Sequence, residues 1–247
     1  MKKMKKALVL CCHGIFHPKG YFVADPRYID RESPPLELDK VAVYFEQMMA
    51  TAHLLRNGAY DRLIVSGGHT KPTIAPDLNE AESYWEIMRY LFSKSETNRV
   101  FLDCISRDSF ENILFSMIKF YRYEGEFPGI LDVMTWNFKK ERLQIILDTL
   151  RIKGHAIGVG EIEGYPSKTS AQIADEIRHD PLHRTRDFAE KRKERTIADF
   201  SPFDWICYDE AGLPPSAGIM KMLEVLEQME KDNNPQLPPG FKFPWEK

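Results

Sequence analysis

Polar side chains follow each of four short apolar segments of the sequence, and these residues are the best candidates for chemistry. The candidates, in chain order, are His13 and Gly14; Ser66, Gly67, Gly68 and Thr70; Asp108, Ser109, Glu111 and Asn112; and Thr135, Lys139 and Arg142. In an open parallel sheet, ligands bind beyond the carboxyl ends of the strands. If the four segments are parallel strands, the sequence therefore predicts one small-molecule site built from several loops.

The types of these residues favour an anionic ligand. A glycine pair such as Gly67-Gly68 lets main-chain N–H groups approach an anion, and Ser66 and Thr70 add hydroxyl donors. Lys139 and Arg142 fall in the first turn of a predicted helix, where cations oppose the helix dipole, and are expected to face the crevice. The alternatives are a simple turn for the glycine pair and surface solvation for the two cations. Neither a Walker loop nor Gly-x-Gly-x-x-Gly is present.

Three residues are candidates for proton transfer: His13, Glu80 and Glu111. Each also has a structural explanation, because a histidine after a strand can serve as a hydrogen bonder, and Glu80 suits the positive end of a helix. Asp108 and Glu111 have the spacing of a helix N-cap pair. Glu80, Asp108 and Glu111 together could hold Mg²⁺, but nothing in their spacing demands it, and no metal site is predicted. Covalent catalysis by Ser66 lacks the Gly-x-Ser-x-Gly elbow.

The elements that must position these residues alternate between short apolar segments and longer amphipathic ones. Strands are expected at residues 7–12, 62–66, 99–102, 130–135 and 155–159, each apolar on both faces, as buried parallel strands are. Helices are expected between them, for example over 41–55, with glycine C-caps at Gly58 and Gly154. This order predicts a three-layer α/β/α sandwich with a Rossmann-like, mostly parallel sheet.

Two regions are distinguished along the chain. Residues 1–160 are expected to form the Rossmann-like core domain, and 161–247 a C-terminal extension that packs on the same core. Within the extension, residues 179–195 carry six basic and four acidic side chains, which favours a solvated helix or loop. A Pro-rich tail follows from residue 233, and its aromatic residues are expected to pack back onto the body.

Composition narrows the class of protein. The 247 residues are 43% hydrophobic, and Lys and Arg minus Asp and Glu give 34 − 37 = −3, so no nucleic-acid partner is indicated. No apolar run approaches the ~18 residues of a membrane span, and the basic start is followed by too short an apolar stretch for a secretory signal. The four cysteines lack zinc-site spacing and are expected to be reduced thiols, which predicts a cytoplasmic protein. The oligomeric state is left open.

Taken together, these motifs resemble the domain of unknown function 218 family, also called the YdcF/SanA/ElyC family, and in particular its soluble branch. The matching pieces run in the family's order over roughly residues 7–160: His13-Gly14, the segment 63–68 with Thr70, the segment 79–84, the segment 108–112 with Ser116, and Thr135 with Phe138-Lys139 and Arg142. The resemblance implies a Rossmann-like fold whose polar motifs line one pocket. It implies no established reaction, although one member is reported to bind S-adenosylmethionine. The chain departs from the family at Cys11-Cys12 and lacks an evident arginine in the helix over 41–55.

Three functional hypotheses follow. The first is a pocket for a phosphorylated or nucleoside-like anionic small molecule, in an enzyme of transferase or hydrolase type, with His13 and Glu80 or Glu111 moving protons. The second, which rests on the family resemblance, is S-adenosylmethionine binding; an acidic residue after the second strand would support it, but that position is Ser66. The third is a non-catalytic binding or regulatory protein that uses residues 179–195 and the tail as its partner surface.

Overall fold

Five parallel strands form the central sheet of the computed structural model, which describes residues 4–17, 21–23, 38–72, 75, 77–161, 169–195 and 216–246. The strands are β1 (Lys6–Cys11), β4 (Arg62–Ser66), β5 (Val100–Asp103), β6 (Ile130–Trp136) and β7 (Ala156–Val159), in the spatial order β5-β4-β1-β6-β7. Every neighbouring pair is parallel. The predicted strands are therefore confirmed, with ends that differ by one residue or none.

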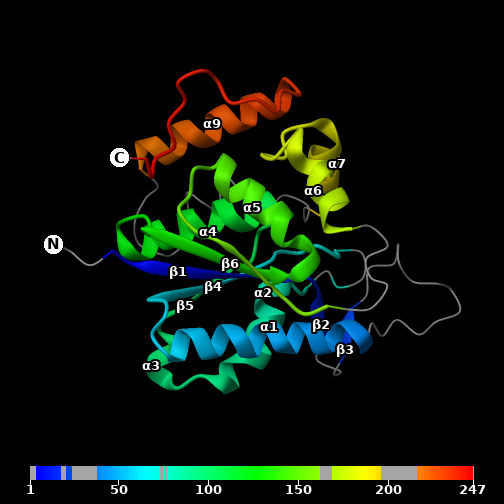
Figure 1. The fold of residues 1–247 in the computed structure, drawn as a ribbon, viewed down its shortest axis with the longest axis vertical. Coiled ribbons are helices and arrows are strands. Elements are labelled where there is room, and N and C mark those ends of the chain that lie inside the picture. The colour runs from blue at the N-terminus through cyan, green and yellow to red at the C-terminus, as the bar shows by residue number, and fades with distance from the viewer. Residues whose placement is uncertain are drawn as a thin grey trace, which may run out of the picture.

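Helices cover both faces of this sheet (Figure 1). On one face lie α1 (Leu38–Arg56), α2 (Glu80–Met88) and α3 (Lys94–Thr97), and on the other α4 (Ser109–Glu124) and α5 (Lys140–Thr149), with short 3₁₀ turns η2 (Arg89–Leu91) and η3 (Asn137–Lys139). Successive strand residues point to opposite faces. Accordingly Leu8 and Leu10 pack with Met48 of α1, whereas Val9 packs with Leu114 of α4. The predicted three-layer α/β/α, Rossmann-like sandwich is confirmed.

The strand order places a topological switch point beside β1. From β1 the chain moves outward through β4 to β5, and α4 then carries it back across the sheet to β6, on the other side of β1. In doubly wound folds, ligands bind in the crevice beyond the carboxyl ends of the two strands at such a point. His13 follows β1, and Lys139 follows β6, so both residues stand at this position.

The C-terminal part of the chain packs outside α4 and α5 (Figure 1). It contains α6 (Ser170–Arg178), α7 (Arg186–Glu194) and α9 (Ala217–Lys231), and α6 and α7 lie toward the carboxyl end of the sheet. Helix α9 buries Ile219 and Met222 in the same apolar cluster as α4. In the tail, Phe243 is buried in that cluster and the Trp245 indole N–H donates to the Leu150 carbonyl at 2.8 Å.

Local features differ from the expectations in two places and agree with them in one. A short antiparallel pair, β2 (Ile15–His17) and β3 (Tyr21–Val23), follows β1 and was not predicted. Gly58 closes α1 with a φ of +71°, as expected. Gly154, however, is not a C-cap, since α5 ends at Thr149; a Cβ at Gly154 would lie 1.8 Å from the Leu131 carbonyl oxygen, so this glycine permits close approach to β6.

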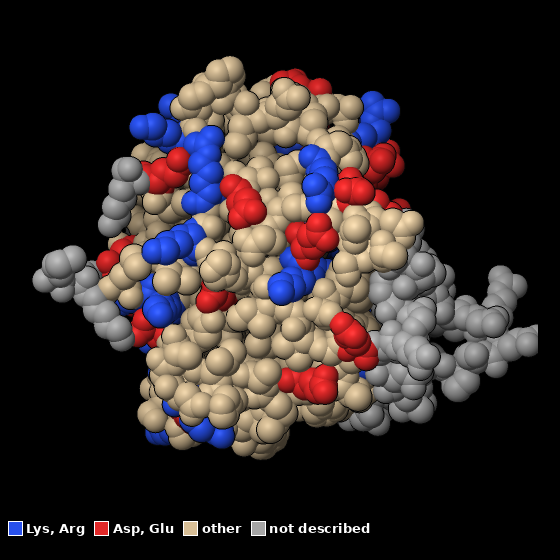
Figure 2. Space-filling model, viewed as in Figure 1, with Lys and Arg blue, Asp and Glu red and all other residues tan. Residues whose placement is uncertain are grey.

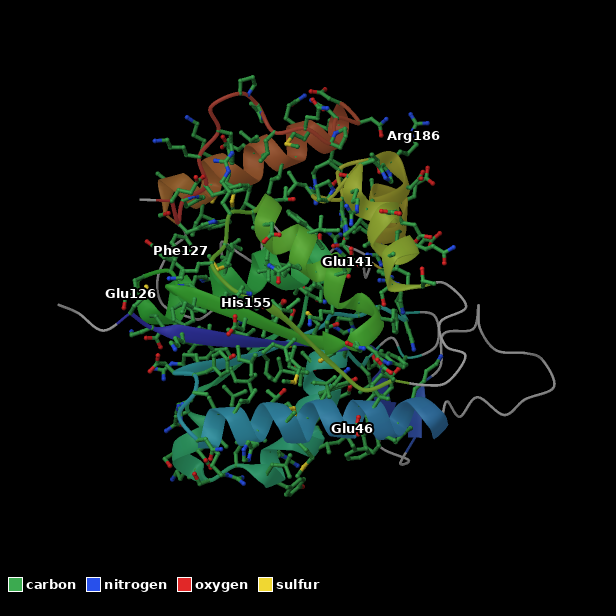
Figure 3. All side chains as sticks on the ribbon, in the orientation of Figure 1. Glu46, Glu126, Phe127, Glu141, His155 and Arg186 are labelled. Atoms are coloured by element: carbon green, nitrogen blue, oxygen red, sulfur yellow. The ribbon has the colours of Figure 1, made fainter. Side chains whose placement is uncertain are left out.

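The prediction that residues 179–195 are simply solvated is wrong for several side chains. Arg192 is only 2% exposed and His183 only 1%. Burial of such groups requires polar partners, which α4 and α9 supply. The adjacent helix α6 is joined to α5 at the surface, where Arg178 donates to Glu141 at 2.9 Å; Figure 3 labels Glu141 on α5 and Arg186 at the start of α7.

On the face shown in Figure 2, basic and acidic side chains of the described residues are interspersed, and neither sign forms a continuous patch. Among the described helices, none combines the length and apolar character that crossing a bilayer requires.

Candidate functional site

His13 is held between the ends of β1 and β6. Its Nε2 lies 3.2 Å from the Thr135 hydroxyl and 3.3 Å from the Trp136 amide nitrogen, and its Nδ1 lies 3.1 Å from the Lys139 ammonium nitrogen. Thr135 and Trp136 end β6, and Lys139 closes the 3₁₀ turn that leads into α5. The sheet and this turn therefore bring together three residues that the sequence analysis selected.

The electrostatics of this cluster favour a neutral imidazole. Burial, and then the charge of Lys139, lowers the pKa of His13 well below its usual value. Burial, and then Arg142, lowers the pKa of Lys139 to about 8. The Trp136 amide donates to Nε2, and a Lys139 ammonium would donate to Nδ1; a neutral imidazole has a single acceptor nitrogen, so it accepts from one of these two donors at a time. Because the two groups oppose each other's protonation, an anion beside them would raise the pKa of both.

Arg142, in the first turn of α5, adds a second cation. Its Nε is buried, and no described residue accepts a hydrogen bond from it. Burial lowers the pKa of Arg142, and the charges of Glu176 and Asp108 offset this only in part. A buried guanidinium N–H without an acceptor is costly, so this position favours an added acceptor such as a phosphate or carboxylate oxygen.

Behind the cluster, Ser66 is fixed at the end of β4. Its hydroxyl donates to Asp103 Oδ2 at 2.6 Å and also lies 3.1 Å from Asn112 Oδ1. Asp103 accepts further hydrogen bonds from the Ser106 hydroxyl and, at 3.2 Å, from the Ile105 amide. Ser66 is thus fully buried and links β4 to β5 and α4 through its hydroxyl. Its closest partner is Asp103, which the sequence analysis did not select.

The glycine pair is a structural turn, and the expectation that its amides cradle an anion is wrong. The Gly67 amide donates to the Asp103 carbonyl at 2.9 Å, and the Gly68 amide donates to the Ser106 carbonyl at 2.8 Å. A Cβ at Gly67 would lie 2.6 Å from Glu80 Oε2 and 2.9 Å from Cys12 Cβ. The glycines therefore let this loop pack tightly, and their N–H groups are committed to the neighbouring loop.

Glu80 and Thr70 belong to the same edge of the sheet. The Thr70 hydroxyl donates to Glu80 Oε1 at 2.6 Å, and Glu80 is 6% exposed. The α2 N-terminus that carries Glu80 is capped by the Asn79 side chain, which accepts from the Glu82 amide. The charge of Glu80 acts on Lys139 by raising its pKa, so this carboxylate partly offsets the effect of burial and of Arg142 on the lysine.

Asp108 and Glu111 lie in a separate ion-pair cluster at the start of α4. Asp108 caps α4 by accepting from the Phe110 and Glu111 amides at 3.0 Å, and it also accepts from Arg192 of α7 at 2.7 Å. Burial alone would raise the pKa of Asp108, but His183 and Arg192 hold it well below its usual range. Arg107 donates to both oxygens of Glu111, at 2.6 and 3.0 Å.

These contacts overturn two expectations. The Glu111 carboxylate is held by a bidentate arginine, and the Asp108 carboxylate is shared between an N-cap and an ion pair, so neither is free to serve as a proton carrier or a ligand donor. The trio of Glu80, Asp108 and Glu111 also forms no cation site: the described residues contain no group of three His, Cys, Asp or Glu side chains placed to hold a metal.

The remaining candidates divide into two groups. Asn112, 9% exposed, lies against both Ser66 and the Cys11 thiol, whose pKa burial raises to about 12. Gly14 is buried after β1, and the Ser109 side chain makes no hydrogen bond with the described residues. Asn112 therefore belongs with Ser66 behind the His13 cluster, whereas no contact among the described residues connects Gly14 or Ser109 with these side chains.

Two residues near the cluster were missed by the sequence analysis. Lys191, on α7, and Arg195, just after it, lower the pKa of nearby groups: Arg195 acts on Lys139, and Lys191 acts on His183. The sequence shows both cations in the charged segment 179–195, but offered no sign that they lie close enough to act on Lys139 and His183.

No family model, curated protein or solved structure matches this chain. Membership of the domain of unknown function 218 family stays a prediction.

Proposed function

We propose that this protein binds a phosphorylated small molecule at the carboxyl edge of its sheet, between the ends of β1 and β6. Lys139 and Arg142 hold the phosphoryl oxygens, and His13 exchanges a proton with the ligand. The observation that carries the proposal is the Arg142 Nε, which is buried and lacks a hydrogen-bond acceptor among the described residues, beside a lysine whose pKa is lowered to about 8. An anion with several acceptor oxygens accepts a hydrogen bond from the Arg142 Nε and also offsets the cost of burying the charge of Lys139.

The arrangement supports phosphoryl transfer to water or an alcohol. In that step, the acceptor oxygen loses its proton to His13 and forms a new P–O bond, while the P–O bond to the leaving group breaks and the leaving group departs with the electron pair. His13 suits the role of base because its pKa is held low until an anion binds, and then rises. The two cations stabilise the charge on the phosphoryl oxygens.

S-adenosylmethionine receives no comparable support. The residue that ends β4, where an acid would recognise a ribose, is Ser66, and the neighbouring Asp103 already accepts hydrogen bonds from Ser66 and Ser106.

The test is thermal unfolding with added ligands at constant ionic strength. Sulfate and phosphate should raise the melting temperature of the wild-type protein, because a ligand that binds only the folded state stabilises it. Arg142→Gln should abolish this increase, and Asn112→Ala should reduce it. Lys140→Gln, a matched control at an exposed position of the same helix, should keep it.

Two outcomes would contradict the proposal. If S-adenosylmethionine alone stabilises the protein, the ligand class is wrong. If sulfate and phosphate stabilise Arg142→Gln as much as the wild type, the anion binds elsewhere.

A further inference from the structure

Helix α7 is fixed against the carboxyl end of the sheet by buried polar contacts. Arg192 donates to Asp108 Oδ2 at 2.7 Å and to the His183 carbonyl at 2.8 Å, and Phe188 stacks on the His183 ring with the centroids 3.8 Å apart. Arg195, just after the helix, donates to the Arg107 carbonyl. These contacts join α7 to the segment that connects β5 with α4, at the same edge as the proposed phosphate site.

Lys191, in the last turn of α7, and Arg195, just after the helix, are both partly buried, whereas Lys193 between them is exposed. Lys191 is partly buried, yet no described carboxylate forms an ion pair with it; its ammonium nitrogen lies 5.9 Å from the centre of the Phe188 ring. Asp108, whose charge raises the pKa of Lys191, is already paired with Arg192. Lys191 is therefore a partly buried cation whose charge is not neutralised by the described residues.

The cations of the α7 segment, Lys191 and Arg195, and the cations of the proposed phosphate site, Lys139 and Arg142, act on each other. Burial, and then Arg195, lowers the pKa of Lys191 to about 7, with further contributions from Arg142 and Lys139. Arg195 in turn lowers the pKa of Lys139. Lys139, Arg142, Lys191 and Arg195 therefore repel one another at this edge of the sheet, with Glu80 and Asp108 acting in the opposite direction, and a bound polyanion would offset the repulsion.

We propose that Lys191 and Arg195 of the α7 segment complete the phosphate site, and that its ligand carries two linked phosphoryl groups, as a diphosphate does. The inference rests on the proposed function: one phosphoryl group occupies Lys139 and Arg142, and the second meets Lys191 and Arg195. A single phosphoryl group carries a charge of about −1.5 to −2 at neutral pH. It balances one pair of cations and leaves the other pair unpaired, whereas two linked groups balance both.

The experiment compares orthophosphate with pyrophosphate by isothermal titration calorimetry on the full chain at pH 7. The wild type should bind pyrophosphate at least about tenfold more tightly than orthophosphate, because only the longer anion reaches both pairs of cations. Lys191→Gln should lower the pyrophosphate affinity by about tenfold and change the orthophosphate affinity by less than about twofold. Lys191→Arg should retain the wild-type preference, and the exposed control Lys193→Gln should match the wild type for both anions.

Each result bears on a different part of the reasoning. If Lys191→Gln binds both anions as the wild type does, while Arg142→Gln loses both, the role of α7 is refuted and the phosphate site stands. If the wild type binds neither anion, the proposed function fails and the diphosphate inference fails with it. Circular dichroism of Lys191→Gln tests whether a loss of pyrophosphate binding is a loss of folding. The Lys191→Arg variant keeps the positive charge, so retained pyrophosphate affinity in this variant shows that the charge at position 191 is what binds.

Discussion

Sulfate binding to this protein should weaken as the pH rises from 7 to 9, and Lys139→Met should remove the part of this change that Lys139 causes. Sulfate keeps its charge over this range, so any pH dependence comes from the protein. The pKa of Lys139 in the ligand-free protein is about 8, lowered by burial and by Arg142. Sulfate binds the ammonium form and holds its pKa above this value, because a buried anion next to a cation favours the charged state.

The magnitude follows from linkage. With a pKa of about 8, Lys139 is roughly 90% protonated at pH 7 and roughly 10% protonated at pH 9. If only the protonated form binds sulfate tightly, the affinity falls about tenfold over these two pH units through Lys139 alone. The charged or titratable groups that act on Lys139 come from every element around it: Cys11, His13, Glu80, Arg142 and Arg195. If Lys191 also contacts the sulfate, its pKa of about 7 adds a second decrease that begins at lower pH.

The assay is isothermal titration calorimetry with sulfate between pH 6.5 and 9.5, in buffers of different ionisation enthalpy. Near pH 9 the wild type should take up a proton for each sulfate bound, and the affinity of Lys139→Met should be lower at pH 7 but approach that of the wild type at high pH. Lys140→Met, the exposed neighbour, should keep the wild-type curve. The reasoning is refuted if wild-type affinity is constant from pH 7 to 9, or if Lys139→Met shows the same slope as the wild type.

Two further predictions concern stability. Asp108→Asn should lower the free energy of unfolding by about 1–3 kcal/mol, measured by urea denaturation, because it removes one buried carboxylate partner of Arg192, which keeps its ion pair with Glu230. Adding Arg192→Met should recover part of the loss, and a decrease below about 0.5 kcal/mol would mean that the ion pair with Asp108 is not what holds α7 in place. Gly67→Ala should cost about 1–3 kcal/mol in the same assay, since its Cβ would lie 2.6 Å from Glu80 Oε2 and the loop would have to shift; an unchanged midpoint would contradict the tight packing of this loop.

The sheet and the centre of the site could be predicted from the sequence because both depend on local patterns. Buried apolar segments such as 62–66 define their own ends, and the parallel arrangement then brings those ends to one edge. His13, Thr135 and Lys139 lie together for this reason, although the chain positions of His13 and Lys139 differ by 126 residues.

The role of the glycine pair could not be decided from the sequence. A Gly-Gly turn that binds an anion and one that packs against a neighbouring loop differ only in where the amides point. Here the carbonyl acceptors are Asp103, the last residue of β5, and Ser106, three residues after it; β5 is the strand next to β4.

The burial of Arg192 could likewise not be predicted from the sequence. A charged segment normally lies in solvent, and only the tertiary fold brings Arg192 to Asp108, 84 residues earlier in the chain. The same contact converts Asp108 from an expected ligand-binding residue into the anchor of α7, the helix that carries Lys191.

The most direct test of the central claim is a crystal structure of the protein with tungstate, a phosphate-like anion whose anomalous scattering locates it without ambiguity. The account predicts a peak between the ends of β1 and β6, with tungstate oxygens about 2.7–3.2 Å from the Arg142 guanidinium and the Lys139 ammonium group. Peaks found only at exposed lysines and arginines, with none at Arg142, would contradict it.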